Sequence, residues 1–543
     1  MYLDDEDIYL ARMQEVLDGH WLNGSTFFYE YKNEMPLMLP LGEYVYSIPS
    51  LALHIPITQI LVFYKFLLPA VLFILIYVFS LNILKNDAGD SAVNKFSAVA
   101  AGLLVVLMED FQNIKKVLTL LNSRSSSPDL SIWTRPVNPI LGALVVFGFL
   151  ILTWNLYKKR NRWLIIPSGI LLGLSIFYFF SWGICISIIG ILLLVACINK
   201  NWKMVKDLLL TIALSFLVSA PYWYSVAISM GKGGKELSLK NGMFFTHAPL
   251  LNKTLLATLV VYLLLTAVAG FSKRSWKEII KQDWWQFCLA LLLGGLWAMN
   301  QQVLTGRTIW PYHFVQYTVP LCFIVLVVAC HKLIRQGFLK IWWICMITFA
   351  GLSLAHGIVM AKSYSYRLED FMRIQQYADV YNWINNNTPK DCVVLVKEQG
   401  EWLTRQIPAF THCNVYVSSW MFSGVPKDRI EHNYLVFLRL IGITSENINS
   451  YLIEHQSEVR GYTFEDWNQL FNKNIDPWLL AKIDGIIKEY QVFVNSDFRV
   501  ELRKYKLDYI ISEEPLKPEE LKDVGLKNEA IYSGKVKIYE LSN

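Results

Sequence analysis

Long apolar runs follow one another through the first two thirds of this chain, and they restrict what it can fold into. About ten runs of roughly 15 to 25 residues are each long enough to cross a bilayer as a helix. Backbone polar groups in lipid must be satisfied internally, so the sequence predicts a polytopic α-helical membrane protein. The runs cover residues 60–84, 94–109, 138–157, 163–181, 183–198, 206–229, 254–271, 284–300, 312–331 and 340–361.

The composition agrees with this prediction and argues against two other classes. Hydrophobic residues make up 54% of the chain and charged residues only 17%, whereas soluble domains carry about 25% charged residues. The net charge of +6 comes from basic residues in short patches between the apolar runs. That distribution is typical of membrane orientation, so we expect membrane lipids and no nucleic acid as partners.

Alternate loops differ in lysine and arginine content, which predicts their sidedness. Cytoplasmic loops carry the excess of basic residues, and here the basic loops lie at 158–162, 200–206, 273–281 and 332–340. The acidic N-terminus and the C-terminal region therefore share the outer side of the membrane. Because a polar segment of about sixty residues does not cross a bilayer unaided, we also expect one further helix before Met1.

The composition changes after residue 362 to that of a soluble domain. A helical pattern precedes an apolar strand, and the alternation of helix and strand is then repeated once. Three more strands are expected near the end of the chain. Helices alternating with strands at this spacing predict a small α/β domain. The expected organisation is a membrane domain at 1–362, with an outer acidic loop at 1–59, followed by an extracytoplasmic α/β domain at 363–543. The patterns in the second domain cover 371–385, 392–396, 401–410, 415–418, 507–511, 530–533 and 536–541.

The eight cysteines show neither a CxxC motif nor the spacing of a metal site. Six lie in or beside apolar runs, where cysteine behaves as a small hydrophobic residue. Only Cys392 and Cys413 fall in the polar region. The sequence leaves open whether these two form a disulfide.

Four consecutive acids, Asp4-Asp5-Glu6-Asp7, open the chain ahead of apolar residues at helical spacing over 9–21. A helix would place Asp5 and Arg12 on nearly the same face. Ionised neighbours repel one another unless a metal, a cation or a proton relieves them. The run is therefore either a helix start, where acids interact well with the helix dipole, or a catalytic cluster.

Aromatic residues and prolines are frequent in the stretch that follows the expected helix. Phe27 and Phe28 stand near its start, and Tyr44 and Tyr46 near its end. Amphipathic aromatic side chains favour the boundary between lipid and water. The stretch is therefore expected to be a re-entrant or interfacial segment in the headgroup region.

Other polar residues stand at the expected outer ends of the membrane helices. Asp110 follows one span and is either a metal ligand or a solvated charge. Arg135 precedes the next span, where arginine either clamps a phosphate through paired hydrogen bonds or reaches the headgroups of ordinary lipids. Gln302 and Arg307, followed by His313, indicate a hydrogen-bonding pocket, because polar residues at membrane depth are commonly functional.

With these features in view, the chain resembles the GT-C superfamily of membrane glycosyltransferases. The similarity is to the bacterial branch related to protein O-mannosyltransferases and aminoarabinose transferases. The stretch Asp5–Arg12 looks like the first-loop motif of that family, and Asn300–Arg307 with His313 looks like its later outer loop. That family has a helix before its acidic loop, in line with the helix expected before Met1.

The resemblance implies transfer of a sugar from a polyprenyl-phosphate carrier to a glycan, lipid or protein acceptor on the outer face of the bacterial inner membrane. Asp5 is then the expected base and Glu6 its helper. A divalent metal held by Glu6 and Asp110 stays open, and no cofactor is certain. The substrate-binding residues would be Arg12, Arg135, Gln302, Arg307 and His313, with arginines on the phosphate.

The alternative is a non-enzymatic transporter or scaffold that handles lipid-linked sugars. Transporters often place polar residues in broken helices near the middle of the membrane and are built from internal repeats. In this sequence the charged candidates gather at the expected outer boundary, and no repeat is visible. That distribution favours the enzyme.

Overall fold

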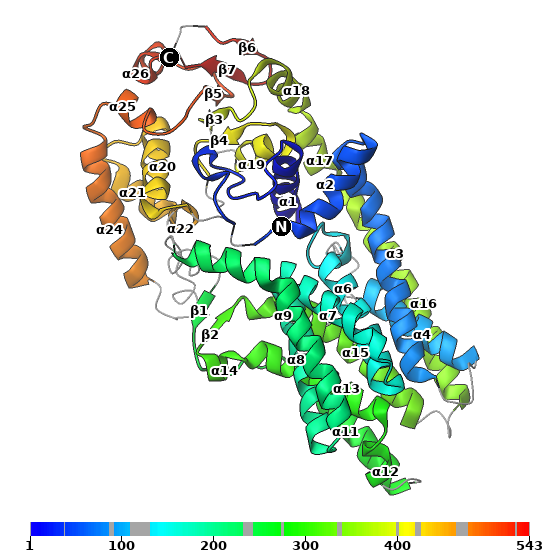
Figure 1. The fold of residues 1–543 in the computed structure, drawn as a ribbon. Coiled ribbons are helices and arrows are strands. Elements are labelled where there is room, and N and C mark those ends of the chain that lie inside the picture. The colour runs from blue at the N-terminus through cyan, green and yellow to red at the C-terminus, as the bar shows by residue number, and fades with distance from the viewer. Residues whose placement is uncertain are drawn as a thin grey trace. The chain divides into compact units, whose positions relative to one another are not determined.

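A computed structural model describes residues 2–36, 38–85, 92–108, 131–231, 243–272, 276–333, 339–397, 401–418, 425–462, 476–526 and 529–541. The chain divides into two units, whose elements are labelled in Figure 1. The α/β unit comprises Met1–Ile57, Tyr224–Phe245 and Glu369–Asn543. The helical unit comprises Thr58–Trp223 and Thr246–Leu368.

Among the described residues, 8 helices are long and apolar enough to cross a membrane. Two shorter apolar segments, which contain α4 (Ala92–Leu107) and α7 (Ile165–Leu174), match the two remaining predicted runs. The prediction of a multi-pass helical membrane protein is confirmed. The long helices are α3 (Ile57–Leu84), α6 (Ile140–Lys159), α8 (Phe179–Ile198), α9 (Trp202–Gly231), α11 (Lys253–Ser272), α13 (Asp283–Asn300), α15 (Val315–Leu333) and α16 (Leu339–Ser363).

Large aromatic side chains fill the interior of the helical unit. The ring of Phe287 on α13 lies 5.1 Å from that of Trp154 on α6 and 6.2 Å from that of Phe79 on α3. Close approach also needs small residues, because a Cβ at Gly294 would lie 2.8 Å from the Cα of Ile188. Glycine at position 294 therefore lets α13 pack directly against α8.

The α/β unit contains a five-stranded sheet with the order β4-β3-β5-β7-β6. Strand β3 lies between β4 and β5 and runs parallel to both, with Leu395 opposite Ile510. Strand β7 is antiparallel to β5 and β6. The predicted C-terminal α/β region is confirmed. The strands are β3 (Val393–Val396), β4 (Asn414–Val415), β5 (Tyr509–Ser512), β6 (Tyr532–Ser533) and β7 (Lys537–Glu540).

Alternate residues of the central strands enter two different hydrophobic cores, as the pleat of a strand requires. Val393 and Leu395 face a core that is filled largely by α20 (Lys427–Leu440) and α24 (Asp476–Phe493). Val394 and Val396 face the opposite core. Residues of α1 (Tyr2–Leu17), α18 (Ala378–Asn387) and α19 (Glu401–Phe410) supply much of that second core.

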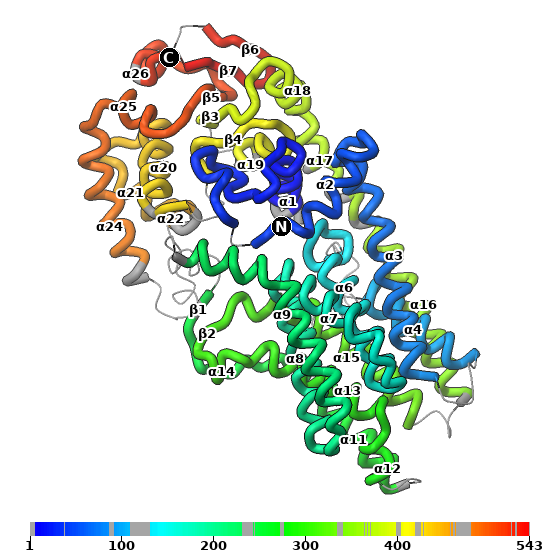
Figure 2. The backbone as a smooth tube through the Cα atoms, viewed as in Figure 1, coloured from blue at the N-terminus to red at the C-terminus, as the bar shows by residue number. Residues whose placement is uncertain are grey.

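The N-terminal segment is thus a layer of the α/β unit. Figure 2 shows α1, in blue, beside α19, in yellow, although almost four hundred positions separate them in the sequence. Phe27 and Phe28 are buried in the same core, and the backbone N–H of Val415 donates to the carbonyl of Phe27 at 3.0 Å. The interfacial prediction was therefore wrong for these two aromatics, because their side chains cover a sheet face. Residues 1–59 were predicted to belong to the membrane domain, whereas Met1–Ile57 belong to the α/β unit.

The remaining α-helices and strands are short. They are α2 (Leu41–Leu53), α12 (Trp276–Ile280), α14 (Gln302–Thr305), α17 (Leu368–Gln375), α21 (Ile448–Glu454), α22 (Gln456–Tyr462), α25 (Phe498–Leu502), α26 (Pro518–Val524), β1 (Met243–Phe245) and β2 (Arg307–Ile309).

Candidate functional site

The acidic run occupies the first turns of α1, where acids interact favourably with the helix dipole. Ile8, Ala11 and Met13 are buried and hold the helix on the α/β unit. The side chain of Glu6 is half-buried and has a polar or electrostatic partner. The side chain of Asp5 lies outside the described part of the structure.

Asp7 points away from bulk solvent and into the α/β unit. Its side chain is buried, and its charge acts on the hydroxyl of Tyr381 on α18. Burial, together with Asp7, raises the pKa of Tyr381 well above its ordinary value. The neutral phenol donates a hydrogen bond to Oε1 of Gln406 on α19. One acid of the run is thus part of the interior of this unit.

Arg12 forms an ion pair with Glu43, and both side chains are almost fully buried. The pair joins α1 to α2. The backbone carbonyl of Arg12 also accepts a hydrogen bond of 2.9 Å from Asn23. A buried arginine held in this way orients the helix that carries the acids.

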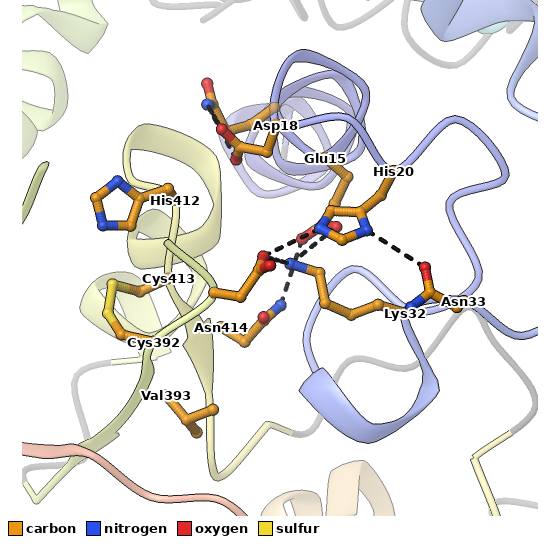
Figure 3. A network of polar contacts seen from close by, with 12 residues as sticks. Glu15, Asp18, His20, Lys32, Asn33, Cys392, Val393, His412, Cys413 and Asn414 are labelled. Carbon is orange, nitrogen blue, oxygen red and sulfur yellow. Dashed lines mark hydrogen bonds and ion pairs between the residues drawn. A yellow bond between two sulfur atoms is a disulfide. The ribbon is translucent and has the colours of Figure 1, made fainter. Parts of the chain in front are cut away.

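A second group of buried charges fixes the other end of α1 (Figure 3). The ammonium group of Lys32 lies 3.3 Å from Oε2 of Glu15 and also pairs with Asp391, which stands just before β3. His20 Nε2 is 3.0 Å from the same Asp391 carboxylate. On the other side, the amide of Asn414 on β4 donates to Glu15 Oε1 at 3.3 Å. This network joins α1, the loop after it and two strands.

Burial and nearby charges move the pKa values of these carboxyl groups in opposite directions. Desolvation raises the pKa of Glu15 to about 8, although the charge of Lys32 opposes the shift. Desolvation also acts to raise the pKa of Asp391, which is more exposed. There the hydrogen bond and charge of Lys32 and those of His20 prevail, and the pKa of Asp391 is lowered. Asp391 is thus the firmly ionised partner of Lys32.

A disulfide between Cys392 and Cys413 stands directly beside this network. Cys392 follows Asp391, and Cys413 precedes Asn414, so the bond joins the ends of β3 and β4 at the residues that hold α1. In the described part of the chain, Cys392, Cys413 and His412 lie close enough together to hold a metal ion. Sulfur atoms in a disulfide cannot serve as thiolate ligands, so the group is not a metal site.

In the helical unit, Arg135 and His313 lie close enough for their charges to interact. Nδ1 of His313 is 3.4 Å from the hydroxyl of Tyr178, which is 3.5 Å from Oε1 of Gln316. The hydroxyl of Tyr317 donates to the carbonyl of Pro139 at 3.3 Å and so ties the start of α6 to α15. A guanidinium, an imidazole and a phenol gathered in this way can bind an oxyanion.

Backbone strain accompanies the same cluster. Val137 has φ 60° and Trp310 has φ 26°, both in the left-handed region that side chains with a Cβ avoid. Such conformations cost on the order of 1–3 kcal/mol each and concentrate at functional sites. Beside them, Asn138 is buried, and its Oδ1 has no hydrogen-bond partner among the described residues. An acceptor in this position suits a hydroxyl group of a ligand.

The other predicted residues of the helical unit differ in burial and in hydrogen bonding. Gln302 is buried and donates to the carbonyl of Ala248 at 3.2 Å. Arg307 has an exposed side chain, and its carbonyl accepts a hydrogen bond of 2.8 Å from Gln301. Asp110 lies outside the described residues. The predicted residues therefore divide between the units, with Asp5, Glu6 and Arg12 in the α/β unit and the described remainder in the helical unit.

Sequence reasoning missed the Glu15–Lys32–Asp391 network. Lys32 and Asp391 are separated by 359 positions, and no local pattern marks either of them. Glu15 stands three residues after Arg12 on a helix, which is ordinary for an exposed ion-paired face. The chain matches no protein-family model, and its sequence matches no curated protein.

Proposed function

We propose that this protein is a glycosyltransferase of the bacterial inner membrane, which moves a sugar from a polyprenyl-phosphate carrier to an acceptor on the outer face. The observation that carries this proposal is the position of the acidic run on α1, a helix anchored by buried ion pairs at Arg12 and Glu15. A catalytic carboxylate needs such rigid support. The resemblance of Asp5–Arg12 to the GT-C first-loop motif supports the same assignment.

In this proposal Asp5 removes the proton of the acceptor hydroxyl. The oxygen of that hydroxyl attacks the anomeric carbon of the sugar. The bond from that carbon to the phosphate oxygen breaks, and its electron pair leaves with the polyprenyl phosphate. A positioned base contributes about 10²–10⁴ in rate. Glu6 assists Asp5, and Arg12 positions α1 because its guanidinium is paired with Glu43.

The negative charge that develops on the leaving phosphate needs preorganised donors. Arg135 is the strongest candidate, because its charge acts on His313, which lies near Tyr178, and Val137 beside it has a strained backbone. Arg307 is a second candidate, since its exposed side chain is available to a ligand. Gln302 contributes by fixing the loop through Ala248.

A divalent metal would suit clustered carboxylates, because hard cations prefer oxygen ligands. Glu6 and Asp110 would hold it. Its role would be to neutralise charge on the phosphate. The chemistry assigned to Asp5 and Arg135 does not require it.

The Cys392–Cys413 disulfide supports an outer location for the α/β unit. Disulfides persist in oxidising compartments and are rare in the cytosol. The basic loops of the sequence favour the same orientation. An outer location gives the enzyme access to acceptors of the cell envelope.

The proposal is tested by incubating membranes that contain the protein with polyprenyl phosphate carrying a labelled sugar. We expect label to move to endogenous acceptors, and Asp5→Asn to lower the rate by about 10²–10⁴. Asp428→Asn is the matched control, because Asp428 is an exposed acid in the first turn of α20 in the same unit. Its rate should equal that of the unaltered protein.

Two results would contradict the proposal. Equal transfer by Asp5→Asn and Asp428→Asn would remove Asp5 from the chemistry. Movement of intact labelled carrier across the bilayer, without release of the sugar, would identify a transporter.

A further inference from the structure

Helix α2 has an apolar outer face. Its exposed positions Val45, Ile48, Leu51 and Ala52 recur at helical spacing, Leu53 is exposed beside them, and all of them are apolar. Ile48 is 50% exposed. Trp21 and Leu22, at 49% and 44% exposure, add two large apolar side chains to the surface of the same unit. The ring of Trp21 lies 5.8 Å from that of Tyr44 on α2, so these residues form one patch, which we call the α2 face.

The opposite side of α2 faces the protein, and its buried side chains are three polar ones, Glu43, Ser47 and Ser50, and Tyr46. Glu43 pairs with the buried Arg12. Ser47 donates to the carbonyl of Met13 at 3.2 Å, and Ser50 donates to that of Ile55 at 2.6 Å. A helix on a water-facing surface has the reverse arrangement, with apolar residues inside and polar residues outside. The exposed side of α2 is therefore suited to apolar surroundings rather than to water.

The chain itself indicates what covers the α2 face. Only His54, Ile55 and Pro56 separate α2 from α3, a membrane-spanning helix that begins at Ile57. Connections of this length reach at most roughly 14 Å, so α2 cannot be far from the membrane boundary. At 13 residues, α2 is about 20 Å long and too short to span the hydrocarbon.

We propose that α2 lies in the membrane interface, with the α2 face inserted among the lipid acyl chains and headgroups. Trp21 and Tyr44 then occupy the headgroup level, where such aromatics are enriched. The Arg12–Glu43 pair joins α2 to α1, so the inserted face also holds α1 at a set depth beside the bilayer. This inference depends neither on glycosyl transfer nor on which side of the membrane the α/β unit occupies.

The test uses a nitroxide spin label at Ile48→Cys, in the full chain reconstituted into phosphatidylcholine–phosphatidylglycerol vesicles. Alanine replaces the six free cysteines, and the disulfide pair is kept. Collisions of the label with oxygen, which enters lipid, are compared with collisions with a nickel chelate, which stays in water. We expect the label at position 48 to be shielded from nickel and to lie about 5–10 Å below the headgroup boundary.

Val492→Cys is the matched control, because Val492 is an apolar residue on a helix of the same unit and is 75% exposed. Its label should collide with nickel and report no depth in lipid. Leu51→Cys repeats the measurement one turn along α2 and should match position 48. The proposal would be overturned if the nickel chelate reached the labels at positions 48 and 51 as readily as the label at position 492. Dipolar broadening between labels of two chains would overturn it as well, since a second copy would then cover the α2 face.

Discussion

The ammonium group of Lys32 lies 3.3 Å from the carboxylate of Glu15, and both side chains are almost sealed from solvent. The same ammonium pairs with Asp391. One buried cation therefore serves two carboxylates. Desolvation by burial raises the pKa of Glu15, and the nearby charges of Asp18 and Asp391 add to the shift. The loop after α1 is joined in this way to the strand end that carries the disulfide.

Lys32→Met should destabilise the α/β unit by about 3–5 kcal/mol, because it leaves the buried Glu15 and the partly exposed Asp391 without their cation. Thermal unfolding of the purified protein in detergent, followed by tryptophan fluorescence, measures the loss. Lys504→Met is the control, since Lys504 is an exposed lysine paired with Glu501, and such surface pairs contribute about 0–1 kcal/mol. Equal melting temperatures for the two variants would show that the buried network is not needed for stability.

The stability of the protein should fall as the pH rises from about 4.5 to about 8, through the contribution of Glu15. Its folded-state pKa of about 8 lies above the ordinary 4.5, so in this window the folded state binds a proton that the unfolded state has lost. Glu15→Gln should flatten the dependence of melting temperature on pH over that range. If the two curves are parallel, Glu15 does not titrate in this window.

Removal of the disulfide should lower stability by about 2–4 kcal/mol, because the bond closes a loop in the unfolded chain. Without reductant, the double variant Cys392→Ala, Cys413→Ala is expected to melt at the temperature at which the unaltered protein melts in dithiothreitol. Dithiothreitol should leave the melting of the variant unchanged. A reductant-sensitive variant, or an insensitive unaltered protein, would contradict the prediction.

Arg135→Lys should reduce kcat/KM for sugar transfer by roughly ten- to a hundredfold, the effect of losing one hydrogen bond to a charged group. Lysine keeps the charge but cannot bind a phosphate through two parallel donors. Arg160→Lys, an exposed arginine at the other end of α6, should transfer at the normal rate. Loss of activity in both variants would indicate a general effect of altering basic residues.

Patterns in the sequence predicted the helices and most strands well. The run 138–157 became α6 (Ile140–Lys159), and the pattern at 392–396 became β3 (Val393–Val396). Both predictions rest on hydrophobic periodicity and length, which are set by residues adjacent in the sequence. The candidate site was harder to predict. The sequence identified Arg135 and His313 separately, and in the structure the charge of Arg135 acts on His313.

The amino-acid sequence by itself determined that this chain has many membrane helices and a C-terminal α/β region, because apolar length and alternation are local properties. Only the tertiary structure decided that Phe27 and Phe28 cover a sheet face, that Cys392 bonds to Cys413, and that Lys32 meets Asp391. These contacts join residues far apart in the chain. Burial then decides what each polar group does: desolvation makes an unpaired charge costly, so the buried Lys32 is stable inside the protein only because it meets Glu15 and Asp391 there.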